Sequence, residues 1–298
     1  MPDKRPFILG TDWWTDVDDA VAVRVFARAH KAGAIDIKGV VINACMEYSC
    51  ASLDAFLCNE GLTDMPIGID LSAVHYGGKP PYQERMAVSG RFRSNGDCDD
   101  AARLYRKILA ETEAVEMAEI GYCTALYKLI TSPPDDVSPM SGYELLEKKV
   151  RRMWVMAGKW DEPDGGYENN LCRTKENMRA ASGFYAKCPV PVTFLGYEIG
   201  VSVLTGDVLK GADDMLARAL YDHGSENGRP SWDPMLALLA VAGDAGKAGY
   251  REARGTAAID PEDGKNKWIG DENGRHGYVV KLKPDDYYKN EINGIIAG

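Results

Sequence analysis

The stretch Pro6-Phe7-Ile8-Leu9-Gly10-Thr11-Asp12-Trp13-Trp14-Thr15-Asp16-Val17-Asp18-Asp19-Ala20 decides the fold of this chain. Its apolar run ends at Gly10 and predicts a buried strand. Apolar residues then recur at helical spacing from Ala22 to Ala29, which predicts a helix directly after the acids. The aspartates therefore lie in a strand-to-helix loop, where an open α/β sheet places its ligand site.

Four carboxylates so close together repel one another unless they share a cation. Oxygen ligands without a nearby histidine or cysteine favour a hard ion such as Ca²⁺ or Mg²⁺. A helix N-terminus also favours aspartate, through capping and the helix dipole. That alternative explains Asp16 and Asp18 but not Asp12, which lies just after the strand. The pattern therefore favours a cation site over a simple cap.

Composition narrows the class of protein. The chain has 298 residues, 45% of them hydrophobic and 27% charged, as in an ordinary globular protein. A net charge of −10 argues against nucleic-acid polymers and anionic membranes as partners. No apolar run approaches the roughly 20 residues of a membrane span, and the few apolar or glycine positions between Arg5 and Thr11 are too few for a signal-peptide core. Seven scattered cysteines without CxxC spacing predict neither a disulfide nor a zinc framework, and favour a reducing cytoplasm.

The rest of the chain alternates between predicted strands and helices. We expect strands at 35–43, 65–69, 115–120, 150–156 and 190–196, with helices between them. This alternation predicts a single α/β domain over residues 1–298, with a mostly parallel central sheet flanked by helices. The segment from 75 to 97 is rich in glycine, proline and charge, and predicts a long loop or lid.

Four motifs, in order, resemble the calcium-dependent nucleoside N-ribohydrolases, also called inosine-uridine-preferring nucleoside hydrolases. The segment 11–20 resembles their N-terminal aspartate fingerprint, and 120–124 is similar to their Thr-Gly-Pro-Leu-Thr segment. Residues 156–158 with 168–170 resemble the family's Met-Gly-Gly and Glu-x-Asn elements, and 232–234 resembles its C-terminal Asp-Pro. The resemblance spans residues 6 to about 270.

The resemblance implies roles for individual residues at the metal and the sugar. The calcium ligands would be the side chains of Asp12, Asp19 and Asp233 and the backbone carbonyl of Ile120, which replaces the family's threonine. Asp12 would also be the general base that activates a metal-bound water. The sugar would be held by Asp18 at a ribose hydroxyl, by Glu168 and Asn170 on the 5′ side, and by Asn43 at the end of the second predicted strand.

The implied reaction is hydrolysis of the N-glycosidic bond of ribonucleosides to free base and ribose, with Ca²⁺ as cofactor. Carboxylates around the ribose would stabilise the positive charge of an oxocarbenium-like transition state. The implied partner is a small-molecule nucleoside, and the family suggests a homodimer or homotetramer. Two alternatives remain: a non-catalytic calcium-dependent nucleoside-binding protein, and a hydrolase of another ribosyl compound.

Departures from the family pattern bear on activity and preference. Gly10 stands where most members have an aspartate, and Trp13-Trp14 replace a Pro-Gly turn. Trp232 stands where broad-specificity members have a histidine, whereas purine-preferring members have an aromatic residue there. This implies stacking on the base and a purine preference. The alternatives are that Trp232 is buried beneath the following helix and that Glu168 and Asn170 form an exposed loop pair.

The histidines show no metal-ligand spacing. His75 and His223 could approach a leaving base, but a solvated loop histidine is the favoured interpretation of each.

Overall fold

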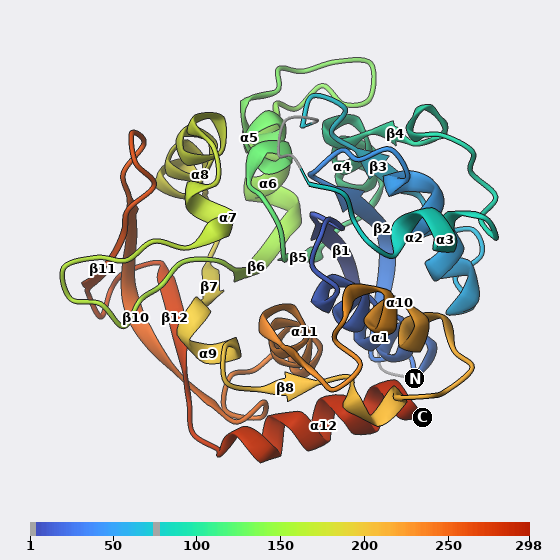
Figure 1. Ribbon diagram of the computed structural model, residues 1–298. Coiled ribbons are helices and arrows are strands. Elements are labelled where there is room, and N and C mark those ends of the chain that lie inside the picture. Colours follow the sequence, from blue (N-terminus) through green and yellow to red (C-terminus); the bar gives the residue numbers. More distant parts are fainter. Residues whose placement is uncertain (1–3, 74–77) are drawn as a thin grey trace.

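The structure is a computed structural model that describes residues 4–73 and 78–298, and it contains one central sheet with helices on both sides (Figure 1). In chain order the strands are β1 (Arg5–Thr11), β2 (Ile35–Ile42), β3 (Ile67–Ile69), β4 (Asp99–Asp100), β5 (Val115–Glu119), β6 (Val150–Met156), β7 (Val192–Leu195), β8 (Leu204–Thr205), β9 (Arg229–Pro230), β10 (Tyr250–Ile259), β11 (Asn266–Gly270) and β12 (His276–Lys281).

No helix within the described residues has the length and apolar character needed to cross a membrane. The helices are α1 (Asp18–Lys31), α2 (Ser49–Asn59), α3 (Gln83–Ala87), α4 (Ala101–Glu111), α5 (Thr124–Thr131), α6 (Gly142–Lys149), α7 (Asn169–Cys172), α8 (Lys175–Lys187), α9 (Tyr197–Gly200), α10 (Met215–His223), α11 (Trp232–Ala242) and α12 (Asp285–Ala297).

The ten-stranded sheet has the order β11-β10-β12-β7-β6-β5-β1-β2-β3-β4. The eight strands from β12 to β4 pair with one another in parallel, whereas β10 pairs antiparallel with both β12 and the edge strand β11. The two-stranded β8-β9 ribbon is separate from this sheet. The prediction of an α/β domain with a mostly parallel sheet is therefore confirmed.

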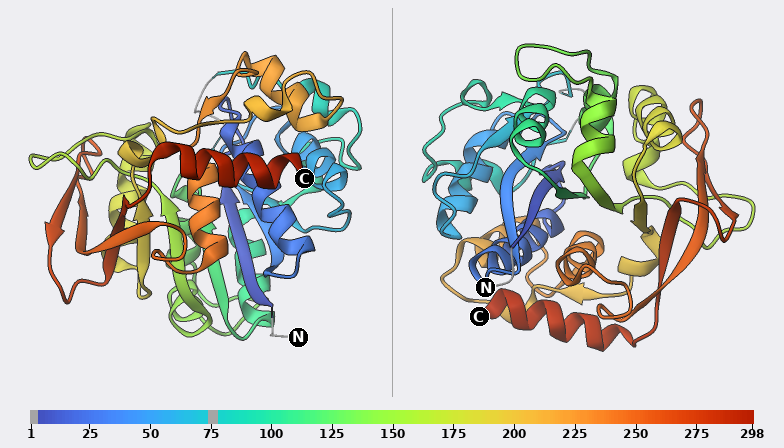
Figure 2. Two further views of the ribbon diagram at one scale, coloured as in Figure 1. Left: turned by 90° about the horizontal axis from the view of Figure 1, so that it is seen from below. Right: turned by 180° about the vertical axis from the view of Figure 1, so that it is seen from behind.

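Helices cover both faces of the sheet, which explains why the sequences of its central strands are continuous apolar runs. On one face, Phe7 and Leu9 pack in a core formed with α1, α2 and α11, and the ring of Phe7 lies 5.5 Å from that of Phe26. On the other face, Ile8 packs in a second core with α4, α5 and α8. Figure 2 shows α12 crossing α1 and α11 on the side away from the sheet.

The order of the strands places the site. From β1 the chain moves outward through β2, β3 and β4, then returns to the other side of β1 as β5. The loops that leave β1 and β5 therefore diverge, and a crevice opens beyond the carboxyl ends of these two strands. The acidic loop follows β1 at this point, and Ile120 follows β5.

The predicted lid at 75–97 is only partly a loop. Residues 74–77, and with them His75, lie outside the described residues. The remainder contains α3 and one turn of 3-10 helix at Asn95–Asp97. The side chains of Tyr82 and Gln83 are buried, so this part of the segment packs against the domain.

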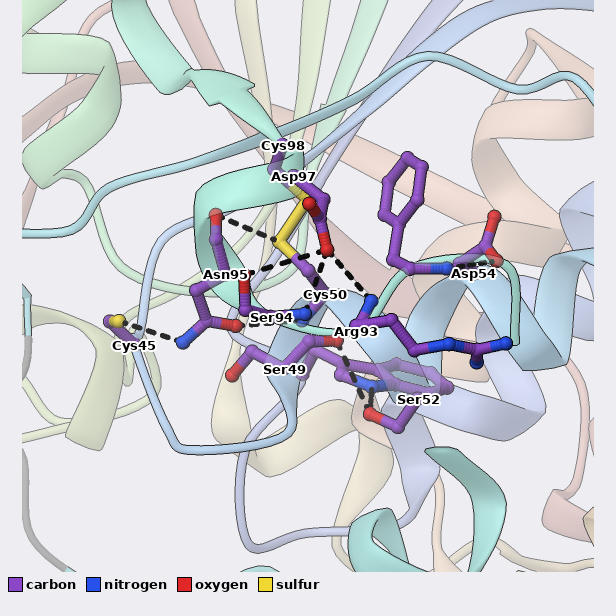
Figure 3. The surroundings of a disulfide bond; sticks show 12 residues. Cys45, Ser49, Cys50, Ser52, Asp54, Arg93, Ser94, Asn95, Asp97 and Cys98 are labelled. Carbon is purple, nitrogen blue, oxygen red and sulfur yellow. Dashed lines mark hydrogen bonds between the residues drawn. A yellow bond between two sulfur atoms is a disulfide. The ribbon is translucent and has the colours of Figure 1, made fainter. Parts of the chain in front are cut away.

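The prediction of no disulfide is wrong. Cys50 at the start of α2 is bonded to Cys98 just before β4, 48 residues further along the chain (Figure 3). Beside the bond, Asn95 accepts a hydrogen bond from the backbone of Cys50 at 3.1 Å and donates one to the carbonyl of Met46 at 2.6 Å. Cysteine spacing could not reveal this pair, because only the packing of the 91–98 segment against α2 brings the two residues together.

Candidate active site

A cavity of about 290 Å³ opens at the switch point between β1 and β5. It is lined by the acidic loop and the start of α1, and by residues from β6, α7, α9, β9 and α11 and from the loops that follow β5 and β6. The cavity is lined by all but one of the residues expected at the site, namely Asp12, Asp18, Asp19, Ile120, Glu168, Asn170, Trp232 and Asp233. Segments more than 200 residues apart in the chain therefore meet at one place.

The carboxylates of the site form a compact buried cluster. Oxygens of Asp18, Asp19 and Asp233 all lie within 4.8 Å of one another, so they can share one ion. Asp12 lies outside that group of three but is hydrogen-bonded to Asp19. The backbone N–H of Asp233, in the first turn of α11, donates to Asp18 at 3.2 Å. The N-termini of α1 and α11 thus both lie at the acids, and their dipoles favour negative charge there.

Burial makes this cluster costly in the absence of a cation. Burial raises the pKa of Asp12 to about 8. Burial, and then neighbouring carboxylates, raise the pKa values of Asp18, Asp19 and Asp233 well above their usual range. A bound divalent cation reverses this effect, because it favours ionised carboxylates. The donors, carboxylate oxygens with the carbonyl of Ile120 nearby, fit a hard ion such as Ca²⁺ or Mg²⁺.

Trp13 anchors the acidic loop after β1 to the core. Its backbone is left-handed at φ 43°, and its buried ring packs 5.5 Å from Phe56 while its Nε1 donates to Ser52 at 2.8 Å. With the ring anchored in the core, the backbone N–H of Trp13 points at Asp19 and donates to it at 3.2 Å. The hydroxyl of Thr11 donates to the same carboxylate oxygen. These two donors fix the orientation of Asp19.

Helix α3 and Tyr82, the residue directly before it, support the loop from outside. The hydroxyl of Tyr82 donates to the carbonyls of Trp14 and Asp16, at 2.9 and 2.8 Å. The side chain of Gln83 donates to the carbonyl of Trp13. The ring of Trp14 lines the cavity. The described part of the predicted lid therefore holds the acidic loop in place.

Glu168 and Asn170 are buried in the cavity wall, so the alternative of an exposed loop pair is wrong. The Glu168 carboxylate accepts from the backbone N–H groups of Gly158 and Asn170, at 2.9 and 2.8 Å. The Asn170 amide donates to the carbonyls of Met156 and Ile120, at 3.0 and 3.4 Å. Burial raises the pKa of Glu168 to about 7. The pair joins the ends of β5 and β6 and faces the acids.

Aromatic rings form the wall beside α11. Trp232 stacks on Tyr197 with ring centroids 5.4 Å apart and 26° between the planes, and its Nε1 donates to the Tyr197 carbonyl at 2.9 Å. Trp232 is half-buried, since it packs on the core and also lines the cavity. Tyr167 adds a further aromatic side chain to the lining, 53% exposed. A flat ring system can bind against such a wall.

Arg229 was not anticipated from the sequence. Its Nε donates to Asp16 at 2.9 Å, and its guanidinium lies 5.6 Å from the centroid of Trp232. Although burial opposes ionisation, the hydrogen bonds and charge of Arg229 lower the pKa of Asp16. Asp16 also accepts from the backbone of Val17 at 2.7 Å, near the start of α1, so its predicted turn role is combined with an ion pair.

His223 lies behind this ion pair. Its Nε2 is 4.0 Å from Asp16 and its Nδ1 is 2.7 Å from the hydroxyl of Ser225. Burial lowers its pKa, which disfavours the protonated ring. His223 is absent from the cavity lining, and it is half-buried at the end of α10 instead of solvated in a loop.

Asn43 is the expected site residue that the structure does not bring into the cavity. Its Nδ2 donates to Glu119 at 2.7 Å, and its Oδ1 accepts from the backbone of Tyr122 at 2.7 Å. The side chain is fully buried beneath the loop that carries Ile120. Both polar groups of its amide are thus engaged by protein atoms.

The fold is that of nucleoside hydrolases. The chain superposes on a plant nucleoside hydrolase, PpNRh1, with a TM-score of 0.72 and 15% identity, over 98% of this chain and 99% of that one. It superposes on the inosine-uridine-preferring nucleoside hydrolase of Bacillus anthracis with a TM-score of 0.70 and 13% identity, over 98% and 99%. The chain also superposes on the type III effector protein XopQ, solved with adenosine diphosphate ribose. The TM-score is 0.66 and the identity 12%, over 99% of this chain and 93% of that one.

Sequence comparison adds no further relationship, because neither a protein-family model nor a curated protein matches this chain. At 12–15% identity the similarity to solved structures establishes the fold. The chemistry has to be argued from the residues of the cavity.

Proposed function

We propose that this chain hydrolyses the N-glycosidic bond of ribonucleosides in a calcium-dependent reaction that releases base and ribose. The buried cluster of Asp12, Asp18, Asp19 and Asp233 carries the proposal, because it lies in a cavity that also presents the aromatic ring of Trp232. A cluster of this kind binds a cation and surrounds a sugar with negative charge. The nucleoside hydrolase fold supports this choice of reaction.

In this proposal Asp12, Asp19, Asp233 and the carbonyl of Ile120 hold the calcium ion. The ion would supply charge that orients the ribose hydroxyls and modestly lowers the pKa of a water. Asp12 takes the proton from the attacking water, since a general base must lie within hydrogen-bond reach of its substrate. Ionised by the cation, Asp12 is a carboxylate able to accept that proton.

The remaining residues hold the sugar and the base. Asp18 accepts a hydrogen bond from a ribose hydroxyl, and Glu168 and Asn170 hold the 5′ side from the opposite wall. As the bond to the base breaks, positive charge develops on the ribose, and these carboxylates stabilise it. Trp232 stacks on the base, which favours the larger purine ring.

The test is ribose release from a panel of purine and pyrimidine nucleosides, with calcium and with a chelator. We expect release with calcium, loss of release with the chelator, and at least a 1,000-fold lower kcat for Asp12→Ala, on the order of what general-base and metal-ligand loss together cost. Asp213→Ala is the matched control, because this aspartate is fully exposed. Calcium binding without release of ribose from any nucleoside would contradict the hydrolase proposal.

Hydrolysis of another ribosyl compound is the second candidate. XopQ, which shares the fold, was solved with adenosine diphosphate ribose. Adenosine diphosphate ribose therefore belongs in the panel. Turnover of that compound without turnover of any nucleoside would favour the second candidate, and tight nucleoside binding without turnover would favour a binding protein.

A further inference from the structure

Gly10 and Glu119 are paired neighbours on the parallel strands β1 and β5, so their side-chain positions lie on the same face of the sheet. A Cβ atom on Gly10 would lie 2.1 Å from Glu119 Oε2, and the next nearest atoms would also belong to that carboxyl group. No side chain can enter that space while Glu119 is there. The carboxylate of β5 thus occupies the position that a side chain on β1 would fill.

Glu119 uses this position to hold the loop that follows its own strand. Its Oε1 accepts from Asn43 at 2.7 Å and from the backbone N–H of Gly121 at 3.0 Å, and its Oε2 lies 3.4 Å from the hydroxyl of Tyr105. Asn43 in turn accepts from the backbone of Tyr122 at 2.7 Å. Glu119 and Asn43 together hold the backbone N–H groups of Gly121 and Tyr122, the two residues directly after Ile120.

The loop after β5, which carries Ile120 and Gly121, lies in direct contact with the acidic loop after β1. A Cβ on Gly121 would lie 2.4 Å from the backbone nitrogen of Asp12 and 2.9 Å from its Cβ. The backbone of Gly121 and that of Asp12 are therefore in close contact. A shift of the loop after β5 would move Ile120 and Asp12 together.

Glu119 is 1% exposed, and within the described residues no basic side chain forms a salt bridge with it. Burying an ionised carboxylate without such a partner costs folding free energy. The amide of a glutamine would make many of the same hydrogen bonds with a smaller loss of hydration free energy. A cation nearby would make a carboxylate preferable to an amide at this position.

We propose that Glu119 is a positioning residue for the cation site: with Gly10 and Asn43 it sets the carbonyl of Ile120 and the carboxylate of Asp12 toward one ion. The inference rests on the proposed function, since it concerns the same cation. It also gives Asn43 a role behind the cavity in place of the predicted sugar contact.

Calcium titration calorimetry on the metal-free protein tests the inference. We expect Glu119→Ala to weaken calcium binding at least 10-fold and Glu119→Gln to weaken it less. The double variant Gly10→Asp/Glu119→Ala returns a carboxylate to the same space from the neighbouring strand, and should bind calcium at least 3-fold more tightly than Glu119→Ala. Glu116→Ala is the matched control, because Glu116 is a buried glutamate of the same strand that pairs with Arg5, away from the cavity.

Denaturant unfolding of each variant separates positioning from general destabilisation. Glu116→Ala should lose stability without losing calcium affinity, whereas Glu119→Ala should lose affinity. Affinity within 2-fold of the wild type in Glu119→Ala, or an equal loss in Glu116→Ala, would overturn the inference and leave the proposed function standing. If Glu119→Ala does not fold, Glu119→Gln with wild-type affinity would overturn it. A wild-type protein that neither binds calcium nor releases ribose would overturn both.

Discussion

At the scale of single residues, Arg229 is the clearest addition made by the structure. Among the described residues that line the cavity it is the one basic side chain, and its partner Asp16 holds it beside Trp232. A leaving base gains negative charge as its bond to the ribose breaks, and a guanidinium nearby stabilises that charge. His223, which the sequence offers for such a role, has a pKa lowered by burial and lies behind Asp16.

Arg229→Ala should therefore lower kcat/KM for natural nucleosides by about 10–100-fold, the range expected for loss of one charged stabilising group. The loss should be at least 5-fold smaller for p-nitrophenyl riboside, whose leaving group is stable without help. Steady-state kinetics on both substrates measure the difference. Arg218→Ala, on an exposed arginine, is the control. An equal fall in kcat/KM for the two substrates would contradict a role in stabilising the leaving base. It would indicate that Arg229 acts in binding or folding instead.

Trp232→Ala tests the stacking role of the aromatic wall. A base stacked on the indole gains about 1–3 kcal/mol, and a purine gains more than a pyrimidine. Turnover of inosine or guanosine at low substrate concentration should thus fall at least 5-fold more than turnover of uridine. Tyr221→Ala, an exposed aromatic residue outside the cavity, should change neither. Equal losses for purines and pyrimidines would contradict stacking.

At the scale of elements, the acidic loop depends on α3, which the sequence presented only as part of a lid. The loop contains a left-handed Trp13, a conformation that costs free energy in a residue other than glycine. The surrounding contacts must therefore over-determine the loop. Tyr82 supplies two of them, through hydrogen bonds to the carbonyls of Trp14 and Asp16.

Tyr82→Phe removes these two hydrogen bonds and leaves the ring in place. We expect the free energy of unfolding to fall by about 1–2 kcal/mol, because buried carbonyls lose their donor. Calcium affinity should fall as well, since the loop carries Asp12 and leads into Asp19. Denaturant unfolding and calcium titration measure the two effects. Tyr221→Phe is the control, and unchanged calcium affinity in Tyr82→Phe would show that Tyr82 does not support the site.

The disulfide ties α2 to the segment before β4. A cross-link between residues 48 positions apart is expected to contribute about 2–4 kcal/mol to the free energy of unfolding, chiefly by restricting the unfolded chain. Reductant should therefore lower the denaturation midpoint of the wild type and leave that of the Cys50→Ser/Cys98→Ser variant unchanged. An identical midpoint for the wild type with and without reductant would contradict this prediction.

At the scale of the whole molecule, the buried acids link stability to pH and to calcium. A carboxyl whose pKa is higher in the folded state binds more protons there than in the unfolded chain, so stability falls as pH rises toward the folded pKa. Asp12, with a pKa raised to about 8, has this sign. His276 has the opposite effect on stability, because burial lowers its pKa from 6.5 to about 4. Its contribution raises stability with pH up to about 6.5 and is constant above that.

The metal-free protein should consequently lose thermal stability between pH 6.5 and 8. Calcium should remove this loss, because it takes the place of the protons on the acids. Melting temperatures measured across this range, in chelator and in calcium, test both statements. Asp213→Asn should leave both curves unchanged. A metal-free melting temperature that rises across the range would contradict the assignment of the buried cluster.

The sequence by itself determined the alternation of strands and helices, the mostly parallel sheet and the acids at the end of β1. These features depend on periodicity and on residues near one another in the chain, which a sequence displays directly. The contribution of Asp233 and Glu168 to the same site could be expected from the motif order, and the structure places both in the cavity with Asp12.

Only the tertiary structure decided which side chains meet across the fold. Arg229 reaches Asp16 across 213 residues, Glu119 fills the space above Gly10, and Cys50 bonds to Cys98. Each pairing depends on strand order, register or helix packing. None of them can be predicted from the spacing of neighbouring residues in the sequence. The physical reason is that a contact between distant segments is a property of the packed chain as a whole.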